Sequence, residues 1–182
     1  MSVGLDSMVL VYAGIVPSNP ATRADDFADL QVRAHILLHK LARRDAIIYL
    51  PTVAIAELLV PVPKAQKGLL IAKLAEKFVC PNFDLHAAAI AAELWAQHKQ
   101  LPHDLQYKNR HLLKADILIT SSARAAGAVE FYSHDKRCRA LAAMIMQAHD
   151  LPREDPEDMF LKGDLQRGEV ELPERFTGRK KK

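Results

Sequence analysis

The sequence predicts an α/β fold of three layers, in which helices cover both faces of a short, mostly parallel central sheet. Short β-prone runs alternate with helical segments along the chain. These β-prone runs are apolar and show little alternation of period two, which is typical of strands buried on both faces. With 182 residues, 49% of them hydrophobic, the chain is long enough for one compact domain with a buried core.

The first half of the chain contains two predicted strands and four predicted helices. A short strand around Val3 and Leu5 precedes a helix that Ser7 can cap. Apolar side chains recur on one side of residues 25–44, which indicates an amphipathic helix. The next predicted elements are a strand at 46–50, a helix at 53–60 and a helix at 64–77.

The second half repeats this alternation. A helix that Asn82 or Asp84 can cap follows a short strand, and a polar loop leads into a helix that Gly127 closes. The predicted bounds are a strand at 78–80, a helix from 82 or 84 to 100, a loop at 101–113, a helix at 114–126, a strand at 128–132 and a helix at 135–149. Residues 1–150 therefore form the predicted domain. Residues 151–182 are acidic at first, contain proline and are predicted to form an extended or partner-docked tail.

Composition excludes several classes of protein. A net charge of +3 and a pI near 8.9 permit an anionic partner such as nucleic acid. The two cysteines, Cys80 and Cys138, form neither a CxxC pair nor a disulfide framework, which favours a reduced, cytoplasmic protein. No signal peptide is evident, and the apolar runs are shorter than the roughly 20 residues that span a bilayer. The absence of a glycine-rich phosphate loop argues against nucleotide-binding classes.

Four carboxylates stand out because each lies in or beside an apolar element. Asp6 follows the first strand and is the only charged residue among the first 22 positions. Glu57 lies in a helix that is otherwise apolar, Asp116 lies near the start of its helix, and Asp135 follows the last predicted strand. In open α/β sheets, ligands gather at the carboxyl ends of the strands. We therefore expect the four side chains to converge.

Converging carboxylates repel one another, and a divalent cation relieves that repulsion. Ligands that are all oxygen atoms suit Mg²⁺ or Mn²⁺ better than Zn²⁺. Each residue also has a simpler interpretation. Asp116 and Asp135 could be ordinary acids near a helix N-terminus, Asp6 could cap its own helix, and Glu57 could be exposed or paired with a cation. These alternatives stay open for single residues, whereas the set favours a metal site.

Four segments of the chain resemble, in order, the motifs of the PIN-domain nucleases, particularly the VapC-like prokaryotic group. They are residues 4–10 (GLDSMVL), 52–59 around Glu57, 114–119 (KADILI) and 132–135 (YSHD). The separation of the last two acids, 135 − 116 = 19, is close to that of the family. The resemblance covers residues 1–150. One departure is Met8, at a position where the family often has asparagine.

This resemblance implies a PIN-like fold and a metal-dependent endoribonuclease that hydrolyses RNA phosphodiester bonds with Mg²⁺ or Mn²⁺. It implies that Asp6, Glu57 and Asp116 are primary metal ligands and that Asp135 is a weaker or second-metal ligand. Ser7 and Ser133 would support these ligands. The family also implies a possible role as the toxin of a toxin–antitoxin pair, with a small antitoxin as partner, and a homodimer is expected.

Basic residues flank two of the acids in sequence. Arg110 and Lys114 precede Asp116, and Lys136 and Arg137 follow Asp135. They could contact RNA phosphates, or they could form an ordinary solvated surface. Aromatic residues make up only 6% of the chain and suggest no stacking platform.

Three other functions compete with the ribonuclease hypothesis. His35 and His39 have the spacing of zinc ligands on a helix, but no third ligand is apparent, so an amphipathic helix face is favoured. A haloacid-dehalogenase-type phosphatase needs a second aspartate where Met8 stands. A PIN-like module that binds RNA or protein without cutting stays open, since Met8 favours it and the four acids oppose it.

Overall fold

Four parallel strands form the centre of the molecule. The computed structural model describes residues 1–16, 26–153 and 173–177. The sheet has the order β2-β1-β3-β4, and every neighbouring pair is parallel. The strands are β1 (Ser2–Leu5), β2 (Ile47–Tyr49), β3 (Glu130–Tyr132) and β4 (Gln147–His149). This arrangement confirms the predicted α/β fold with a short, parallel central sheet.

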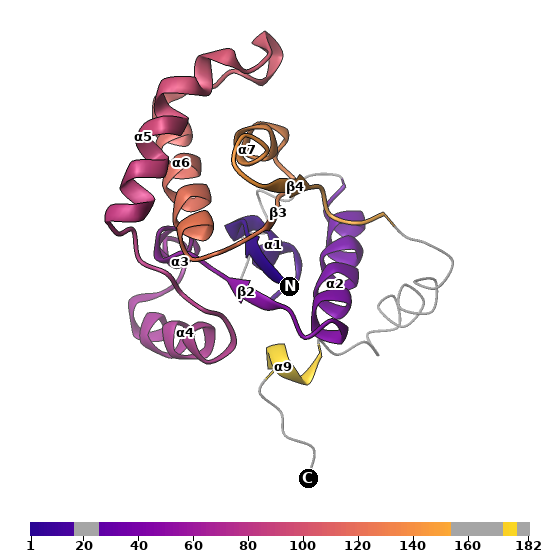
Figure 1. The fold of residues 1–182 in the computed structure, drawn as a ribbon. Coiled ribbons are helices and arrows are strands. Elements are labelled where there is room, and N and C mark those ends of the chain that lie inside the picture. The colour runs from indigo at the N-terminus through magenta and orange to yellow at the C-terminus, as the bar shows by residue number, and fades with distance from the viewer. Residues whose placement is uncertain (17–25, 154–172, 178–182) are drawn as a thin grey trace.

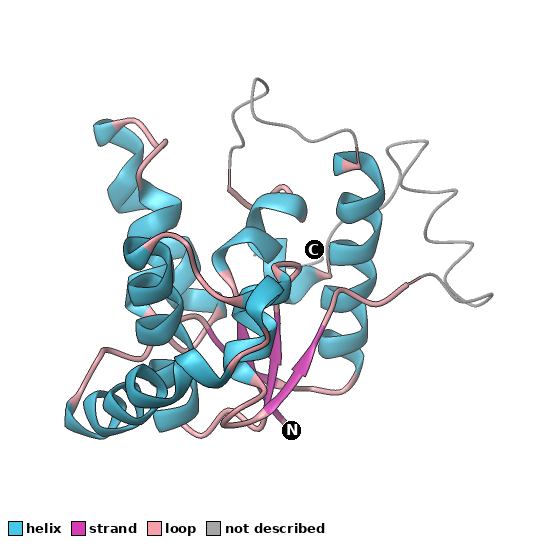
Figure 2. Ribbon diagram, turned by 90° about the horizontal axis from the view of Figure 1, so that it is seen from above, coloured by secondary structure: helices cyan, strands magenta, loops and turns pink. Residues whose placement is uncertain are grey.

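Helices cover both faces of this sheet (Figures 1 and 2). The described helices are α1 (Ser7–Tyr12), α2 (Phe27–Arg43), α3 (Thr52–Leu59), α4 (Lys64–Lys77), α5 (Leu85–Gln97), α6 (Arg110–Ala125), α7 (Lys136–Ala142) and α9 (Glu174–Thr177). Because parallel crossovers are right-handed, α1 and α2 lie on one face, and α6 and α7 lie on the other. Helix α5 packs along the outer side of α6, and α3 contacts both α1 and α6.

The strand order creates a switch point between β1 and β3. The chain leaves β1 in the direction of β2, and it leaves β3 in the opposite direction, toward β4. The connections after these two strands therefore diverge at their carboxyl ends, the place where open α/β sheets bind ligands. Leu5 is paired with Tyr132 in the register, so Asp6 and Ser133 leave the sheet side by side.

The structure corrects two predicted elements. The predicted helix at 135–149 is wrong, because α7 ends at Ala142 and residues Gln147–His149 form β4. The segment has neither a proline nor a glycine to mark the break, and pairing with β3 overrides its helical composition. The strand predicted at 78–80 is reduced to a single bridge between Val79 and Tyr49.

The helix that carries Asp116 begins four residues before the predicted start. Asn109 caps α6, and its side chain accepts a hydrogen bond from the backbone N–H of His111 at 2.8 Å. The predicted loop at 101–113 therefore contains the first turn of α6 and a short 3₁₀ turn, His103–Leu105. As predicted, Gly127 follows the end of α6, with a positive φ of 102°.

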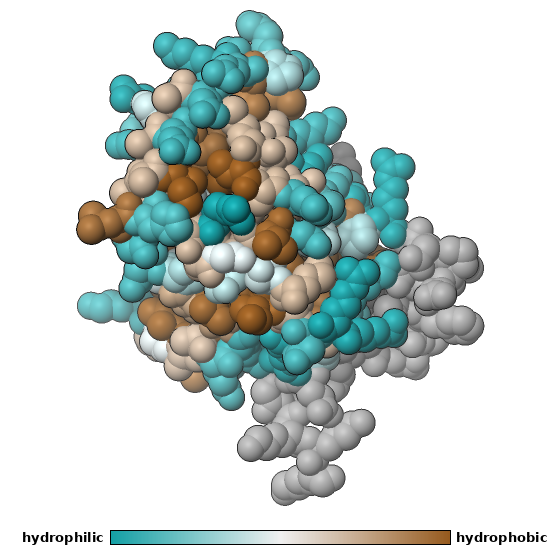
Figure 3. All heavy atoms as spheres, in the orientation of Figure 1, coloured by the Kyte–Doolittle hydropathy of each residue, from teal (hydrophilic) through white to brown (hydrophobic). Residues whose placement is uncertain are grey.

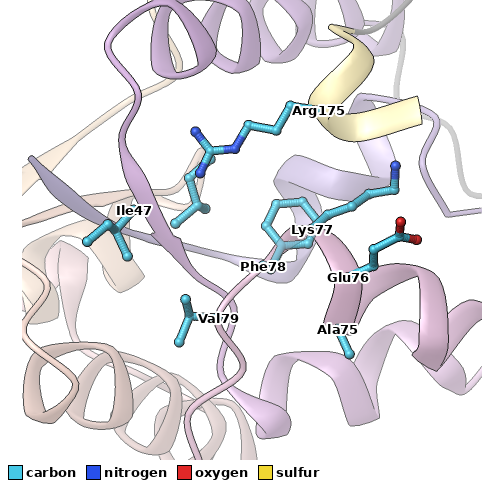
Figure 4. Close-up of a pocket in the computed structure, with 8 residues that line it drawn as sticks. Ile47, Ala75, Glu76, Lys77, Phe78, Val79 and Arg175 are labelled. Atoms are coloured by element: carbon cyan, nitrogen blue, oxygen red, sulfur yellow. The ribbon is translucent and has the colours of Figure 1, made fainter. Parts of the chain in front are cut away.

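The described part of the tail packs against the domain. In α9, Phe176 is buried and stacks on Phe78 with a centroid distance of 5.8 Å. Arg175 donates a hydrogen bond to the Ala46 carbonyl, just before β2, at 2.6 Å. Figure 4 shows Arg175 reaching over β2 beside a hollow of about 270 Å³, which Ile47, Lys77 and Phe78 also line. The rest of the predicted tail, 154–172 and 178–182, and the predicted helix start at residue 25 lie outside the described residues.

The molecular surface is mixed in character. The face in Figure 3 carries both hydrophilic and apolar side chains, and apolar side chains come to the surface over α4 and α5. Val60, Leu69 and Leu85 are among the exposed apolar residues. No helix in the described part of the chain is both long enough and apolar enough to cross a bilayer.

Gly4 lies where β1 packs tightly against both α6 and β3. A Cβ atom at this position would lie 2.7 Å from Cδ2 of Phe131 and 2.8 Å from Cβ of Ala123. Both neighbours are fully buried, so neither has room to move aside. A side chain at position 4 would therefore push β1 away from α6 or from β3.

We expect Gly4→Ala to destabilise the protein by about 1–3 kcal/mol through overpacking. Gly68→Ala is the matched control, because Gly68 lies within α4 and a Cβ there would meet nothing within 4 Å. That change should stabilise the protein by up to about 1 kcal/mol. Urea unfolding of both variants measures the difference. Equal effects at the two positions would contradict the close packing at Gly4.

Candidate functional site

Asp6 is an almost completely buried carboxylate at the end of β1. Its side chain does not cap α1, although Asp6 occupies the capping position, so the simple capping interpretation is wrong. Instead, Oδ2 accepts a hydrogen bond from Ser133 Oγ at 2.7 Å, and Oδ1 lies 3.3 Å from Ser7 Oγ. Only 7% of the residue is exposed. Burial raises the pKa of Asp6, the bonds from Ser133 and Ser7 oppose that rise, and the charge of Asp135 adds to it.

Ser7 connects Asp6 to Glu57. Ser7 is the first residue of α1 rather than its cap, and its hydroxyl donates to Glu57 Oε2 at 2.9 Å. Glu57 extends from α3, and although much of this residue is exposed, its carboxylate reaches the buried serine. Partial burial raises the pKa of Glu57, the hydrogen bond from Ser7 opposes the rise, and the charge of Asp6 reinforces it.

Asp116 reaches the same region from the second turn of α6. Its Oδ2 accepts a hydrogen bond from the hydroxyl of Tyr107 at 2.6 Å. Burial raises the pKa of Asp116 to about 7, the hydrogen bond from Tyr107 opposes the rise, and the charges of Asp6, Asp135 and Glu57 reinforce it. The pKa of Tyr107 is raised by burial and by the negative charge of Asp116.

Asp135 caps α7, as its simpler interpretation expected. Its Oδ1 accepts hydrogen bonds from the backbone N–H groups of Arg137 at 2.7 Å and of Cys138 at 3.4 Å. Its own backbone N–H donates to Ser133 Oγ at 3.1 Å, and that hydroxyl in turn donates to Asp6. Capping uses only one carboxylate oxygen. Asp135 therefore combines a structural role with a place at the edge of the acidic cluster.

The structure thus brings together all four predicted acids, which we call the acidic cluster: Asp6, Glu57, Asp116 and Asp135. Each of the three raised pKa values includes repulsion from at least one other member. For the described residues, no lysine or arginine figures among the charges that shift these three pKa values. Within residues 1–16, 26–153 and 173–177, no basic side chain therefore offsets the repulsion among these carboxylates.

Carboxylate oxygen atoms with uncompensated charge fit a hard divalent cation. In the described residues, no three histidine, cysteine or carboxylate side chains are arranged as a complete set of ligands around one point. Such a cage is not required, because Mg²⁺ keeps several water ligands and commonly binds through one or two carboxylates. The donor set of the acidic cluster therefore fits Mg²⁺ or Mn²⁺.

Arg139, Asp150, His134 and Arg33 form a polar network that holds the loop with Ser133 and Asp135 in place. Arg139 donates to the carbonyls of Ser133 at 2.9 Å and His134 at 2.6 Å, and it lies 3.3 Å from Asp150. Asp150 also accepts from His134 Nδ1 at 3.0 Å and pairs with the buried Arg33 of α2 at 3.2 Å. Burial alone would raise the pKa of Asp150, but these partners and the Leu151 N–H hold it below its usual value.

Sequence patterns did not reveal these supporting residues. Tyr107 lies in a predicted loop without periodicity, and Arg33 lies on the apolar side of an amphipathic helix. Cys138 is buried beneath the acidic cluster, and burial followed by the charges of Asp6 and Asp116 raises the pKa of its thiol. Only a charged residue on the apolar side of an amphipathic helix, as at Arg33, offers a weak signal of such a role.

The predicted RNA-binding residues lie on two helices next to the acids. Lys136 and Arg137 form the first turn of α7, and Lys114 is exposed on α6. The guanidinium of Arg110 lies 5.3 Å from the ring centroid of Trp95, so this arginine is partly engaged by the aromatic ring. His35, one of the two histidines considered as zinc ligands, is buried in α2.

Comparison with known proteins supports the fold. No family model and no curated protein matches the sequence. A solved structure, VapBC2 from Rickettsia felis bound to a DNA fragment from its promoter, contains a chain that is similar in three dimensions. The likeness has a TM-score of 0.54, covers 84% of this chain and 100% of that chain, and has 18% sequence identity. The protein therefore has the fold of a PIN domain, the fold of VapC toxins.

The raised pKa of Asp116 predicts a pH-dependent stability in the absence of metal. Because its folded pKa of about 7 lies above the ordinary 3.8, this carboxyl contributes full stability below about pH 4. That contribution is lost as the pH rises through 7. We expect Asp116→Asn in EDTA to be more stable than wild type at pH 8 by on the order of 1–3 kcal/mol, with little difference at pH 4.

Urea unfolding of both proteins between pH 4 and pH 8 measures this difference. Glu93→Gln, which removes an exposed carboxylate from the neighbouring helix α5, serves as the control and should leave stability almost unchanged. A gap between wild type and Asp116→Asn that stays constant with pH would contradict the assignment.

Proposed function

We propose that this protein is a Mg²⁺- or Mn²⁺-dependent endoribonuclease that hydrolyses RNA phosphodiester bonds at the acidic cluster. The observation that supports this most strongly is the uncompensated negative charge at the switch point of the sheet, where no protein cation lowers the raised pKa values among the described residues. Three carboxylates with elevated pKa values in one cluster are costly to fold. A bound cation would offset that cost and would explain why the carboxylates lie together.

In this proposal Asp6, Glu57 and Asp116 hold the principal metal ion, and the free oxygen of Asp135 contributes to a weaker or second site. The ion, when bound, supplies an activated water and stabilises charge on the scissile phosphate. Ser133 orients the Asp6 carboxylate through its hydrogen bond, and Ser7 donates to Glu57 while lying 3.3 Å from Asp6. The network around Asp150 keeps the 133–135 loop in place, and burial of Asp6 excludes bulk water from one side of the site.

The basic residues at the start of α7 supply the second element of the proposal. Lys136 and Arg137 directly follow Asp135, so a phosphate at the acidic cluster would lie near their charges. Such contacts give affinity that is independent of base sequence. Lys114 on α6 would extend this surface, and Arg110 would add to it from beside Trp95.

The similarity to the Rickettsia felis structure also suggests a biological role. We propose that the protein acts as the toxin of a toxin–antitoxin pair, with a small antitoxin as partner, and that it forms a homodimer. A gene for a small DNA-binding protein next to the gene for this chain would support that role. Growth arrest on expression of wild type but not of Asp116→Asn would support it independently.

We expect cleavage of labelled single-stranded RNA by wild-type protein in Mn²⁺ or Mg²⁺ and none in EDTA. Asp6→Asn and Asp116→Asn should each lower the rate by about 100-fold or more, because each removes a proposed metal ligand. Glu93→Gln should cleave like wild type. Mn²⁺ should also stabilise the wild-type protein by mass action, and its unfolding temperature should rise. At a Mn²⁺ concentration 100 times the dissociation constant, the gain in the free energy of unfolding is about 2.7 kcal/mol.

The outcomes separate the two candidate functions. Undiminished cleavage by either aspartate variant would place the activity elsewhere or in a contaminant. If folded wild-type protein neither cuts RNA nor gains stability from Mn²⁺, the enzyme hypothesis fails, and a non-cutting PIN-like module that binds RNA or protein becomes the better description.

We expect the double change Lys136→Ala and Arg137→Ala to weaken RNA binding, measured with the uncleaving Asp116→Asn protein as background. The slope of log affinity against log salt should fall by about 0.7 for each phosphate contact that is lost. Lys64→Ala, at the start of α4 away from α7 (Figure 1), is the control and should leave the slope unchanged. An unchanged slope in the double variant would show that the first turn of α7 lies outside the RNA path.

A further inference from the structure

Tyr107 makes the hydrogen bond that determines how the Asp116 carboxylate is oriented. Its hydroxyl donates to Oδ2 at 2.6 Å, and within the described residues this is the only hydrogen bond that the Asp116 side chain accepts. The other oxygen, Oδ1, is left without such a donor. A tyrosine hydroxyl keeps its proton at neutral pH, so it acts as a donor to the carboxylate.

The ring of Tyr107 is held in place by packing that does not involve Asp116. It lies against a second hydrophobic cluster that joins three helices, with members Ala91, Leu94, Leu113, Ile117 and Leu141. The preceding residue, Gln106, donates to the carbonyl of Leu101 at 3.0 Å and fixes the loop. The 3₁₀ turn His103–Leu105 contacts α7, so the loop is anchored on both sides of the site.

A rigid donor beside a flexible carboxylate has a definite consequence. Rotation about the bond between Cβ and Cγ would turn the plane of the Asp116 carboxylate, and the hydrogen bond from the Tyr107 hydroxyl to one of its two equivalent oxygens holds that plane in one direction. The selected orientation reserves Oδ1 for another ligand. Partners of this kind, which hold a metal-binding side chain without touching the metal, commonly change affinity by 10- to 100-fold.

We propose that Tyr107 is a positioning residue of the metal site, which holds Asp116 in the orientation that binds the cation. This inference rests on the proposed function, since it assumes that Asp116 is a metal ligand. The inference assigns a function to the loop between α5 and α6. The ribonuclease proposal alone gives this loop no function.

The test is Tyr107→Phe, which removes the hydroxyl and keeps the ring in the hydrophobic cluster. We expect the dissociation constant for Mn²⁺, measured by calorimetric titration without RNA, to rise about 10-fold or more. The unfolding midpoint in EDTA should change by about 4 °C or less, which shows that the fold is kept. In cleavage assays the half-saturating Mn²⁺ concentration should rise by the same factor, with the rate largely restored at saturation.

Tyr132→Phe is the matched control, because the Tyr132 hydroxyl also donates to a carboxylate, that of Glu130 at 3.0 Å, outside the acidic cluster. It should leave Mn²⁺ binding unchanged. If wild type binds Mn²⁺, Asp116→Asn does not, and Tyr107→Phe binds as tightly as wild type or more tightly, the role of Tyr107 is wrong and the metal site stands. If wild type binds no Mn²⁺, both proposals fall together.

Discussion

Asp6 is buried almost entirely at the carboxyl ends of β1 and β3. Much of the surrounding structure stabilises this buried carboxylate. Burial disfavours its charged form, and the hydroxyl of Ser133 supplies a hydrogen bond that water would otherwise make. Ser133 is itself fixed by the backbone of Asp135 and by the grip of Arg139 on its carbonyl. The parallel register of β1 with β3 keeps these residues within reach of one another.

The same arrangement sets function against stability. Burial of carboxylates costs free energy, yet Asp6 at the end of β1, Glu57 from α3 and Asp116 from α6 all have raised pKa values. Two hydrophobic clusters compensate, one around the sheet and one that joins α5, α6 and α7. Tyr107 packs against the second cluster and also donates a hydrogen bond to Asp116, so this one side chain connects the hydrophobic cluster to the acidic cluster.

Features carried by local pattern could be predicted from the sequence. Asp6 and Asp135 each follow an apolar run. These runs predicted the parallel sheet, and the positions of the two acids at their ends predicted that the acids converge. The fourth strand could not be predicted, because Gln147–His149 has no β-prone composition and is a strand only through its pairing with β3. The supporting roles of Tyr107 and Arg33 could not be predicted for a related reason. Tyr107 contacts Asp116, 9 residues away, and Arg33 pairs with Asp150, 117 residues away, in addition to its ion pair with Asp29 one helical turn earlier; no periodicity connects Tyr107 to Asp116 or Arg33 to Asp150.

The hydrogen bond between Ser133 and Asp6 joins residues that are 127 positions apart in the chain. During synthesis Asp6 is therefore made 127 residues before its principal donor, and β3, the strand beside it, is made only after α1 to α6. A nascent chain therefore holds an unsupported carboxylate until β3 inserts next to β1. The acidic cluster needs residues as far along the chain as Asp135, so a product truncated before β3 lacks the assembled cluster.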